Sequence, residues 1–136
     1  LKKVSTKWLL RCRMVDKYVP EDYPMICEWA RKRKINPPSQ DMLPNFGAVV
    51  QDVACGFLFM TDGDFAYIDF YFTNPEAKSH SRRFALQCIT EQLIQWAREM
   101  EYSRIMANTE IQSIEELAII NGFRNIGKFS VLMRSL

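Results

Sequence analysis

Apolar and polar residues follow strand-like and helix-like spacings in turn along the chain, in the order β-α-β-β-β-α-β-α-β-β. The expected strands cover residues 8–15, 46–52, 53–61, 64–73, 104–108, 123–126 and 129–133. The expected helices cover residues 20–34, 85–97 and 113–121. A mostly antiparallel front half that meets a βαβ-like unit predicts an α/β or mixed α+β fold. We expect a central sheet of about six or seven strands, with helices on both faces.

The strand over residues 64–73 carries the most information. Asp62-Gly63 precedes it and indicates a hairpin with the strand before. Gly56, inside that earlier strand, indicates a bulge or a close approach of backbone. Strict alternation predicts two faces for residues 64–73. One face would carry Tyr67, Asp69 and Tyr71, and the other Ala66, Ile68, Phe70 and Phe72.

A short basic segment, EAKSHSRR over residues 76–83, links this strand to the long helix. Backbone N–H groups at the start of a helix have no internal partner, and the helix dipole is positive there. Lys78, His80, Arg82 and Arg83 add cationic side chains at the same end. This combination favours an anion site, for which a phosphate is the obvious occupant. The alternative is that these side chains simply point into water.

Size and composition predict one ordinary globular domain over residues 1–136. Hydrophobic residues make up 48% and charged residues 25% of the chain. A net charge of +2 gives no bulk-charge argument for nucleic acid, so we expect no nucleic-acid partner. The run Arg31-Lys32-Arg33-Lys34 is either a nucleic-acid or partner patch or a solvated helix end. Neither a membrane-length apolar run nor a signal-peptide pattern is present, so we expect no membrane association.

The four cysteines, Cys12, Cys27, Cys55 and Cys88, have spacings that match no zinc motif. Their apolar surroundings predict reduced, mostly buried thiols and a cytoplasmic protein. With one histidine, His80, a His-rich metal site is excluded, and we expect no metal. The sequence does not predict the oligomeric state.

The strand ending in FTNPEAK, the long helix after it and the segment NTEIQSIEELAIINGF resemble the Gcn5-related N-acetyltransferases over nearly the whole chain. The linked segments LPNFGAVV, ACGFLFMTD and NPEA…RRFALQ are similar to short acetyltransferase-like proteins of tailed bacteriophages. The resemblance implies acetyl-CoA as the cofactor, bound where the central strand separates from its neighbour. It implies that backbone groups of Phe70, Phe72 and Thr73 bind pantetheine and that Asn108 touches the cofactor. It also implies a diphosphate site at Lys78, Ser79, His80, Ser81, Arg82 and Arg83.

Two features of the family pattern are missing, at three positions. The family's diphosphate turn is typically Q/R-x-x-G-x-G/A, and Ser81 and Arg83 stand where its glycines would be. Many members carry a tyrosine four residues before the Gly-Phe pair as the acid for the leaving thiolate, and Ala118 stands there. These departures keep two functions open. One is an N-acetyltransferase acting on an amine of a protein or small molecule. The other is a weakly active or inactive protein that binds a partner, for a phage a host protein.

Direct acetyl transfer needs a base for the amine and a proton source for the thiolate. Asp69 is the first candidate base and Tyr71 the candidate acid. The alternatives are that Asp69 is an ordinary surface carboxylate and that Tyr71 packs in the core. Acceptor specificity is expected from the loops at residues 16–24 and 35–45 and from the final hairpin.

Overall fold

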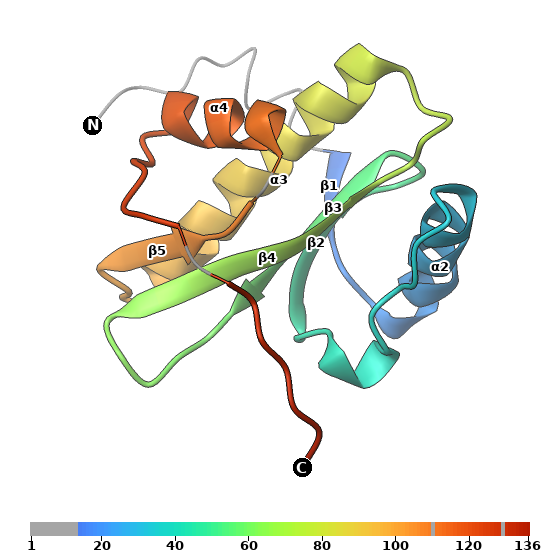
Figure 1. Cartoon of the computed structure of the whole chain (residues 1–136). Helices are drawn as coiled ribbons and strands as arrows, with labels where there is room; N and C mark the ends of the chain where they lie inside the picture. Colours follow the sequence, from blue (N-terminus) through green and yellow to red (C-terminus); the bar gives the residue numbers. More distant parts are fainter. Residues whose placement is uncertain (1–13, 110, 129) are drawn as a thin grey trace.

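The computed structural model describes residues 14–109, 111–128 and 130–136 of the chain (Figure 1). Five strands form one sheet in the order β1-β2-β3-β4-β5. They are β1 (Val15–Lys17), β2 (Phe46–Val50), β3 (Ala54–Phe59), β4 (Phe65–Thr73) and β5 (Arg104–Ala107). Neighbouring strands from β1 to β4 are antiparallel, and β5 runs parallel to β4.

Within the described ranges, three α-helices cover this sheet on its two faces (Figure 1). They are α2 (Tyr23–Lys32), α3 (Ser79–Glu99) and α4 (Gln112–Ile120). Short 3-10 turns, η2 (Pro20–Asp22) and η3 (Gln40–Met42), precede α2 and β2. A core that includes Leu58, Ile68 and Ile89 lies between the sheet and α3, and α4 packs against its rim. A second core, which includes Ile26 and Phe57, lies between the opposite face and α2.

Most of the expected elements are confirmed, with shifted ends. The mixed α/β class, the antiparallel front half and the long βαβ unit are all present. Pro24 occupies the first turn of α2, as its fixed φ favours. Gly122 ends α4 with a φ of +89°, where the Phe123 N–H bonds back to the Ala118 carbonyl oxygen. Cys55 and Cys88 are buried and Cys27 is partly buried, whereas Cys12 lies outside the described residues.

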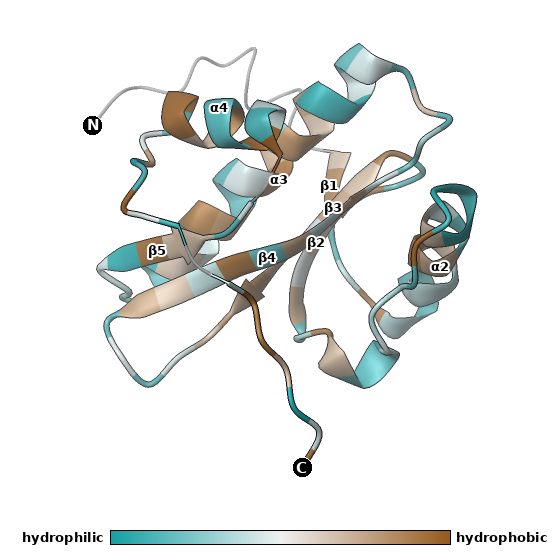
Figure 2. Cartoon of the chain, viewed as in Figure 1, coloured by the Kyte–Doolittle hydropathy of each residue, from teal (hydrophilic) through white to brown (hydrophobic). Residues whose placement is uncertain are grey.

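Several expectations about the chain ends are wrong or fall outside the described part. Residues 8–13 of the first expected strand are not among the described residues, and β1 begins at Val15. Residues 123–128 and 130–136 form no strand, so the described sheet has fewer strands than expected. An alternating pattern supplies strand propensity, but a strand also needs a pairing partner. This segment has none in the described structure. Figure 2 shows it leaving the sheet with hydrophobic residues along it.

Two details of the helices also differ from the sequence prediction. The apolar pattern of residues 113–121 predicts Leu117, Ala118 and Ile120 on the inner side of the helix. Ile120 is instead 74% exposed, while Ile114 and Leu117 pack toward the core. Helix α3 begins at Ser79 rather than near Ala85, because no proline or glycine in residues 79–84 interrupts it. The basic residues from His80 to Arg83 therefore lie in the first turns of α3 and not in a loop.

A β-bulge in β4 changes the orientation of its second half. Cys55 pairs with Phe72 and Phe57 pairs with Asp69, so Phe70 and Tyr71 together oppose the single residue Gly56. Phe70 takes a left-handed conformation with a φ of +56°. Strict alternation is thereby broken, and the predicted faces are wrong beyond Asp69. Phe70 and Phe72 pack on the α2 side, whereas Tyr71 packs on the α3 side.

Among the described residues, no helix combines the length and apolarity that a membrane crossing requires. In the same part of the chain, His, Cys, Asp and Glu side chains do not gather into any group of three or more that could hold a metal ion.

Candidate functional site

Strands β4 and β5 pair over only part of their length. The parallel register runs from Phe65–Arg104 to Ile68–Ala107. Beyond Ile68, β4 continues to Thr73, and within the described residues the edge facing β5 has no pairing strand there. A strand edge with unpaired backbone groups can bind an extended amide-bearing ligand by adding hydrogen bonds to it. Phe70, Phe72 and Thr73, the residues expected to bind pantetheine, all lie on this stretch, where the Phe70 N–H is bonded to Asp69 and the Thr73 carbonyl oxygen to Arg33.

Asn108 lies immediately after β5, next to the point where the two strands separate. Its side-chain Oδ1 atom is buried and has no hydrogen-bond partner in the described structure. A buried amide oxygen without a partner is destabilising, because its hydration is lost and not replaced. The atom therefore fits a site that a donor from a ligand completes, as expected for the neighbouring strand of the cofactor site.

The link between β4 and α3 is held in a defined shape. The Asn74 side chain accepts a hydrogen bond from the Glu76 N–H at 2.9 Å and donates to the Asp52 carbonyl oxygen at 2.8 Å. The Arg82 guanidinium donates to the carbonyl oxygens of Pro75 and Ala77. Arg82 thus stabilises the turn. From the sequence alone, this role could not be distinguished from a direct contact with phosphate.

The first turn of α3 presents donors without partners inside the helix. Arg82 N–H donates to the Lys78 carbonyl oxygen, so the N–H groups of Ser79, His80 and Ser81 precede the helical hydrogen-bond ladder. No acidic residue lies in this turn. Lys78, Ser79, His80 and Arg83 are exposed, and Ser81 is partly exposed. The structure therefore brings the expected anion-binding residues to one helix end.

The C-terminus of α2 reaches the end of β4 from the other side of the sheet. Arg33 donates to the Thr73 hydroxyl at 2.7 Å and to its carbonyl oxygen at 3.3 Å. Lys32 pairs with Glu76 at 2.9 Å. The basic run at residues 31–34 is therefore not only a solvated helix end, because it ties α2 to the link before α3. It also occupies two of the polar atoms of Thr73.

Asp69 lines a cavity of about 430 Å³ on the α2 side, together with Met42, Phe59, Tyr67 and Phe70. The carboxylate oxygen Oδ1 accepts the Phe70 N–H at 2.7 Å. Oδ2 has no partner among the described residues, so one oxygen is fixed and the other is available to a ligand. Asp69 is partly buried beside apolar and aromatic walls, next to the unpaired stretch of β4.

Tyr67 lines the same cavity and was not selected from the sequence. Burial raises the pKa of its hydroxyl, and the negative charge of Asp69 raises it further. Tyr67 therefore stays protonated at neutral pH and is available as a donor beside Asp69. The alternation of residues 64–73 places Tyr67 and Asp69 on the same face of the strand. That pattern could have identified Tyr67 as a candidate site residue.

Tyr71 lies on the opposite face, which corrects the expectation that it stands beside Asp69. Its hydroxyl is 2.7 Å from the Thr90 Oγ1 atom on α3, and burial raises its pKa to about 12. The bulge at Phe70 moves this side chain into the core. Its expected role as a catalytic acid finds no support in this geometry.

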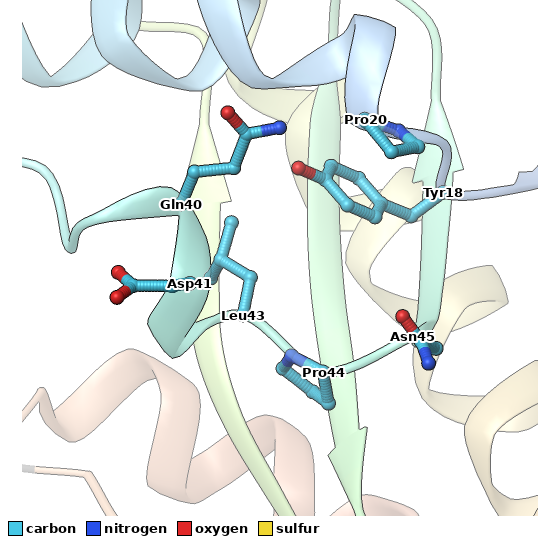
Figure 3. A pocket seen from close by; sticks show the side chains of 7 residues that line it. All are labelled: Tyr18, Pro20, Gln40, Asp41, Leu43, Pro44 and Asn45. Atoms are coloured by element: carbon cyan, nitrogen blue, oxygen red, sulfur yellow. The ribbon is translucent and has the colours of Figure 1, made fainter.

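A smaller cavity, of about 320 Å³, lies on the same side of the sheet (Figure 3). Its lining residues come from the segment after β1 and from the loop that contains η3: Tyr18, Pro20, Gln40, Asp41, Leu43, Pro44 and Asn45. The loop at residues 35–45 therefore contributes to both cavities, because Met42 lines the larger one. Residues 16–24 and 35–45, two of the loops expected to determine acceptor specificity, thus both line the smaller cavity.

No family model matches the sequence, and no curated protein matches it. Solved structures do match the fold. Rv2747 of Mycobacterium tuberculosis, in complex with CoA and NLQ, superposes with a TM-score of 0.68 at 19% identity, over 87% of this chain and 75% of that one. An acetyltransferase of Trypanosoma brucei has a TM-score of 0.68 at 12% identity, over 88% and 98% of the two chains. The aminoglycoside 6'-N-acetyltransferase AAC(6')-IG of Acinetobacter haemolyticus gives 0.55 at 11%, over 90% and 98%.

At these identities the matches establish fold and not activity. The separation of β4 from β5, the β4 bulge and the long helix after β4 are the features on which the candidate site is built. The chain has the fold of the Gcn5-related N-acetyltransferases.

Proposed function

We propose that the protein is an acetyl-CoA-dependent N-acetyltransferase that acts on an amine. The observation that carries the proposal is the β4–β5 separation, which leaves a strand edge of β4 unpaired from the region near Asn108, whose Oδ1 atom is buried and without a partner, toward the link that leads into α3. Backbone amides along β4 suit the amide groups of pantetheine. The start of α3 suits a diphosphate.

Ser81 and Arg83 replace the glycines of the family pattern, so the phosphates meet side chains as well as amides. The Arg83 side chain is exposed, and the N–H groups of Ser79 and His80 precede the hydrogen-bond ladder of α3. Arg82 holds the turn by its carbonyl contacts. In this arrangement Lys78 and Arg83 neutralise phosphate charge, and the helix end supplies directed donors.

Acetyl-CoA, when bound, supplies the acetyl group as a thioester. Asp69 would accept a proton from the ammonium form of the acceptor, or from its nitrogen as the new N–C bond forms and the C–S bond breaks. The CoA thiolate leaves and takes its proton from solvent. The free Oδ2 atom is the proton acceptor, because Oδ1 is held by the Phe70 N–H. Tyr67, protonated and beside Asp69, orients the acceptor by a hydrogen bond. Met42, Phe59 and Phe70 give this side of the site an apolar lining.

The test combines calorimetry with acetyl-CoA and a thiol-release assay against a panel of amines. We expect binding of acetyl-CoA and amine-dependent thiol release. Asp69→Asn should lower kcat/KM by about a hundredfold or more, with acetyl-CoA affinity unchanged. Asp62→Asn, an exposed aspartate in the turn before β4, is the matched control and should retain full activity. Unchanged thiol release in Asp69→Asn would refute the assignment of the base.

A second candidate is a binding protein on the same fold, and the departures at Ser81, Arg83 and Ala118 favour it. The exposed apolar residues near the C-terminus also favour it, since Val131, Leu132 and Met133 are each more than three-quarters exposed, at 79%, 90% and 82%. The similarity to phage-encoded proteins makes a host protein the expected partner. This second function would be favoured if the protein binds a host protein and releases no thiol from acetyl-CoA with any amine.

A further inference from the structure

We propose that the cavity at Tyr18 is a second subsite for the acceptor, which takes a protonated amine separated by a short aliphatic chain from the nitrogen that is acetylated. The inference rests on the proposed function, and it names the class of acceptor: a linear diamine or a longer chain with that spacing.

The site is built around a buried hydroxyl. Tyr18 is 7% exposed, and its hydroxyl oxygen has no hydrogen-bond partner in the described part of the chain. Figure 3 shows the hydroxyl directed from the sheet toward the side of the cavity lined by Gln40 and Leu43. A buried hydroxyl is normally bonded. A ligand group in this cavity would supply the bond that Tyr18 lacks.

Tyr18 is fixed in this position by its packing. Its ring meets the Phe57 ring edge-on with 4.9 Å between centroids. Its N–H donates to the Gly47 carbonyl oxygen at 2.7 Å. A Cβ atom at Gly47 would lie 2.7 Å from the Tyr18 Cβ and 2.6 Å from a Phe57 ring carbon, so only glycine admits this pair. The hydroxyl cannot easily turn elsewhere for a partner.

The lining selects a cation with an apolar body. Pro20, Leu43 and Pro44 give apolar walls that suit methylene groups, and Gln40 and Asn45 offer amide oxygens. Asp41 is the one charged residue in the lining. Burial raises the pKa of the Tyr18 hydroxyl, and the negative charge of nearby Asp22 raises it further. Lys17, the adjacent cation, lies over the Phe46 ring, which packs on the α3 side.

The two cavities are neighbours on one face of the sheet. The Phe57 ring packs against Tyr18, and Phe57 pairs with Asp69 across β3 and β4. Phe59, two residues further along β3, lines the Asp69 cavity. Two residues of strand span about 7 Å. The turn η3 separates the cavities, with Gln40 and Asp41 on one side and Met42 on the other. The proposed acceptor therefore carries an aliphatic chain of several methylene groups between its two nitrogens.

The experiment compares hexamethylenediamine with hexylamine, which has the same carbon chain and a single amine. Thiol release should show a KM about tenfold lower for the diamine, since one charge-assisted hydrogen bond and one ion pair are gained. Tyr18→Phe keeps the ring packing, and Asp41→Asn keeps the side-chain size. Each should raise KM for the diamine toward that for hexylamine, with kcat and the hexylamine KM unchanged. Asp62→Asn is the charge control and should leave both values unchanged.

Calorimetry of hexamethylenediamine without acetyl-CoA gives an independent readout. Binding in the wild type that is weakened about tenfold in Tyr18→Phe supports the subsite, even when no amine is acetylated, in which case only the proposed function fails. Equal KM values for the two amines, with no effect of Tyr18→Phe on either readout, overturn the subsite and leave the acetyltransferase proposal standing.

Discussion

The hydroxyl of Tyr71 donates a hydrogen bond to the Oγ1 atom of Thr90, 2.7 Å away, across the interface between β4 and α3. The direction follows from Thr90, whose own proton goes to the Leu86 carbonyl oxygen at 2.8 Å. This pair belongs to the core that joins the sheet to α3. Tyr71 therefore lies on the α3 face of the sheet, whereas Asp69 lies on the α2 face.

Replacement of the two tyrosines therefore separates a core role from a site role. Tyr71→Phe should lower the free energy of unfolding by about 1 kcal/mol, for one lost internal hydrogen bond, and leave kcat/KM for acetyl transfer unchanged. Tyr67→Phe should do the reverse, with little change in stability and a kcat/KM lower by about tenfold. Urea titration and thiol release measure the two quantities. If Tyr71→Phe loses activity but keeps normal stability, Tyr71 has a role in catalysis and not only in the core.

Alkaline pH should destabilise the protein through two buried acids. Burial raises the pKa of Cys55 from 9.0 to about 12 and that of Tyr71 from 10.0 to about 12. Above these unfolded-state values the unfolded chain loses protons that the folded chain keeps, so the free energy of unfolding falls as pH rises. Their contribution is intact below about pH 9. It is then lost by about 1.4 kcal/mol per pH unit for each group, from about pH 9 for Cys55 and about pH 10 for Tyr71.

Urea titrations from about pH 8 to about pH 11 measure this slope. Tyr71→Phe is the control, because it should remove the part of the slope that begins near the pKa of a free tyrosine and retain the part from Cys55. An identical slope in the wild type and in Tyr71→Phe would show that Tyr71 titrates normally and is not buried as described.

Gly56 should tolerate no side chain. A Cβ atom there would lie 2.5 Å from a Tyr71 ring carbon and 3.0 Å from the Ile89 Cγ2 atom. Gly56→Ala should therefore cost about 1–3 kcal/mol of stability by overpacking. Gly63→Ala is the matched control, since its nearest contact would be an ordinary 3.5 Å, and its cost should be under about 1 kcal/mol. Stability is measured by urea titration, and equal costs for the two variants would contradict the packing of Tyr71 over Gly56.

The same pair explains how far the sequence could predict β4. Alternation placed residues 65–69 on their correct faces, and Gly56 was correctly read as a bulge or a close approach. The sequence did not show that Tyr71 fills the space above Gly56, because this contact joins two strands and a helix. That tertiary contact accompanies the left-handed conformation of Phe70 and reverses the faces of residues 70–72.

The site could be predicted in outline for a different reason. Asn74 and the start of α3 are local features, whose turn and helix-end chemistry follows from nearby residues. The partners of Arg33 and Arg82 were not predictable, because a long side chain selects among carbonyl oxygens only once the fold brings them near. The two strands expected over residues 123–126 and 129–133 were not predictable from the local pattern either. A strand forms only where the fold supplies a partner strand, and the local pattern does not identify that partner.

Diphosphate binding at the start of α3 can be tested with two arginines of one helix. Arg83 lies in its first turns and Arg98 in its last turn, and both are exposed. Arg83→Glu should weaken CoA binding by about tenfold, because it replaces an attractive charge with a repulsive one beside the phosphates. Arg98→Glu makes the same change in net charge at the far end, where we expect CoA affinity to stay the same.

Pantetheine, which lacks the diphosphate, makes the test specific. Its affinity, measured by calorimetry, should be equal in the wild type and in Arg83→Glu, since its contacts lie along β4 and at Asn108. The loss for CoA should also shrink as salt is added, because exposed charges are screened over about 10 Å at 0.1 M ionic strength. If Arg83→Glu weakens pantetheine as much as CoA, the variant has disturbed the β4 edge and not a phosphate contact. If it weakens neither, the diphosphate does not bind at this helix end.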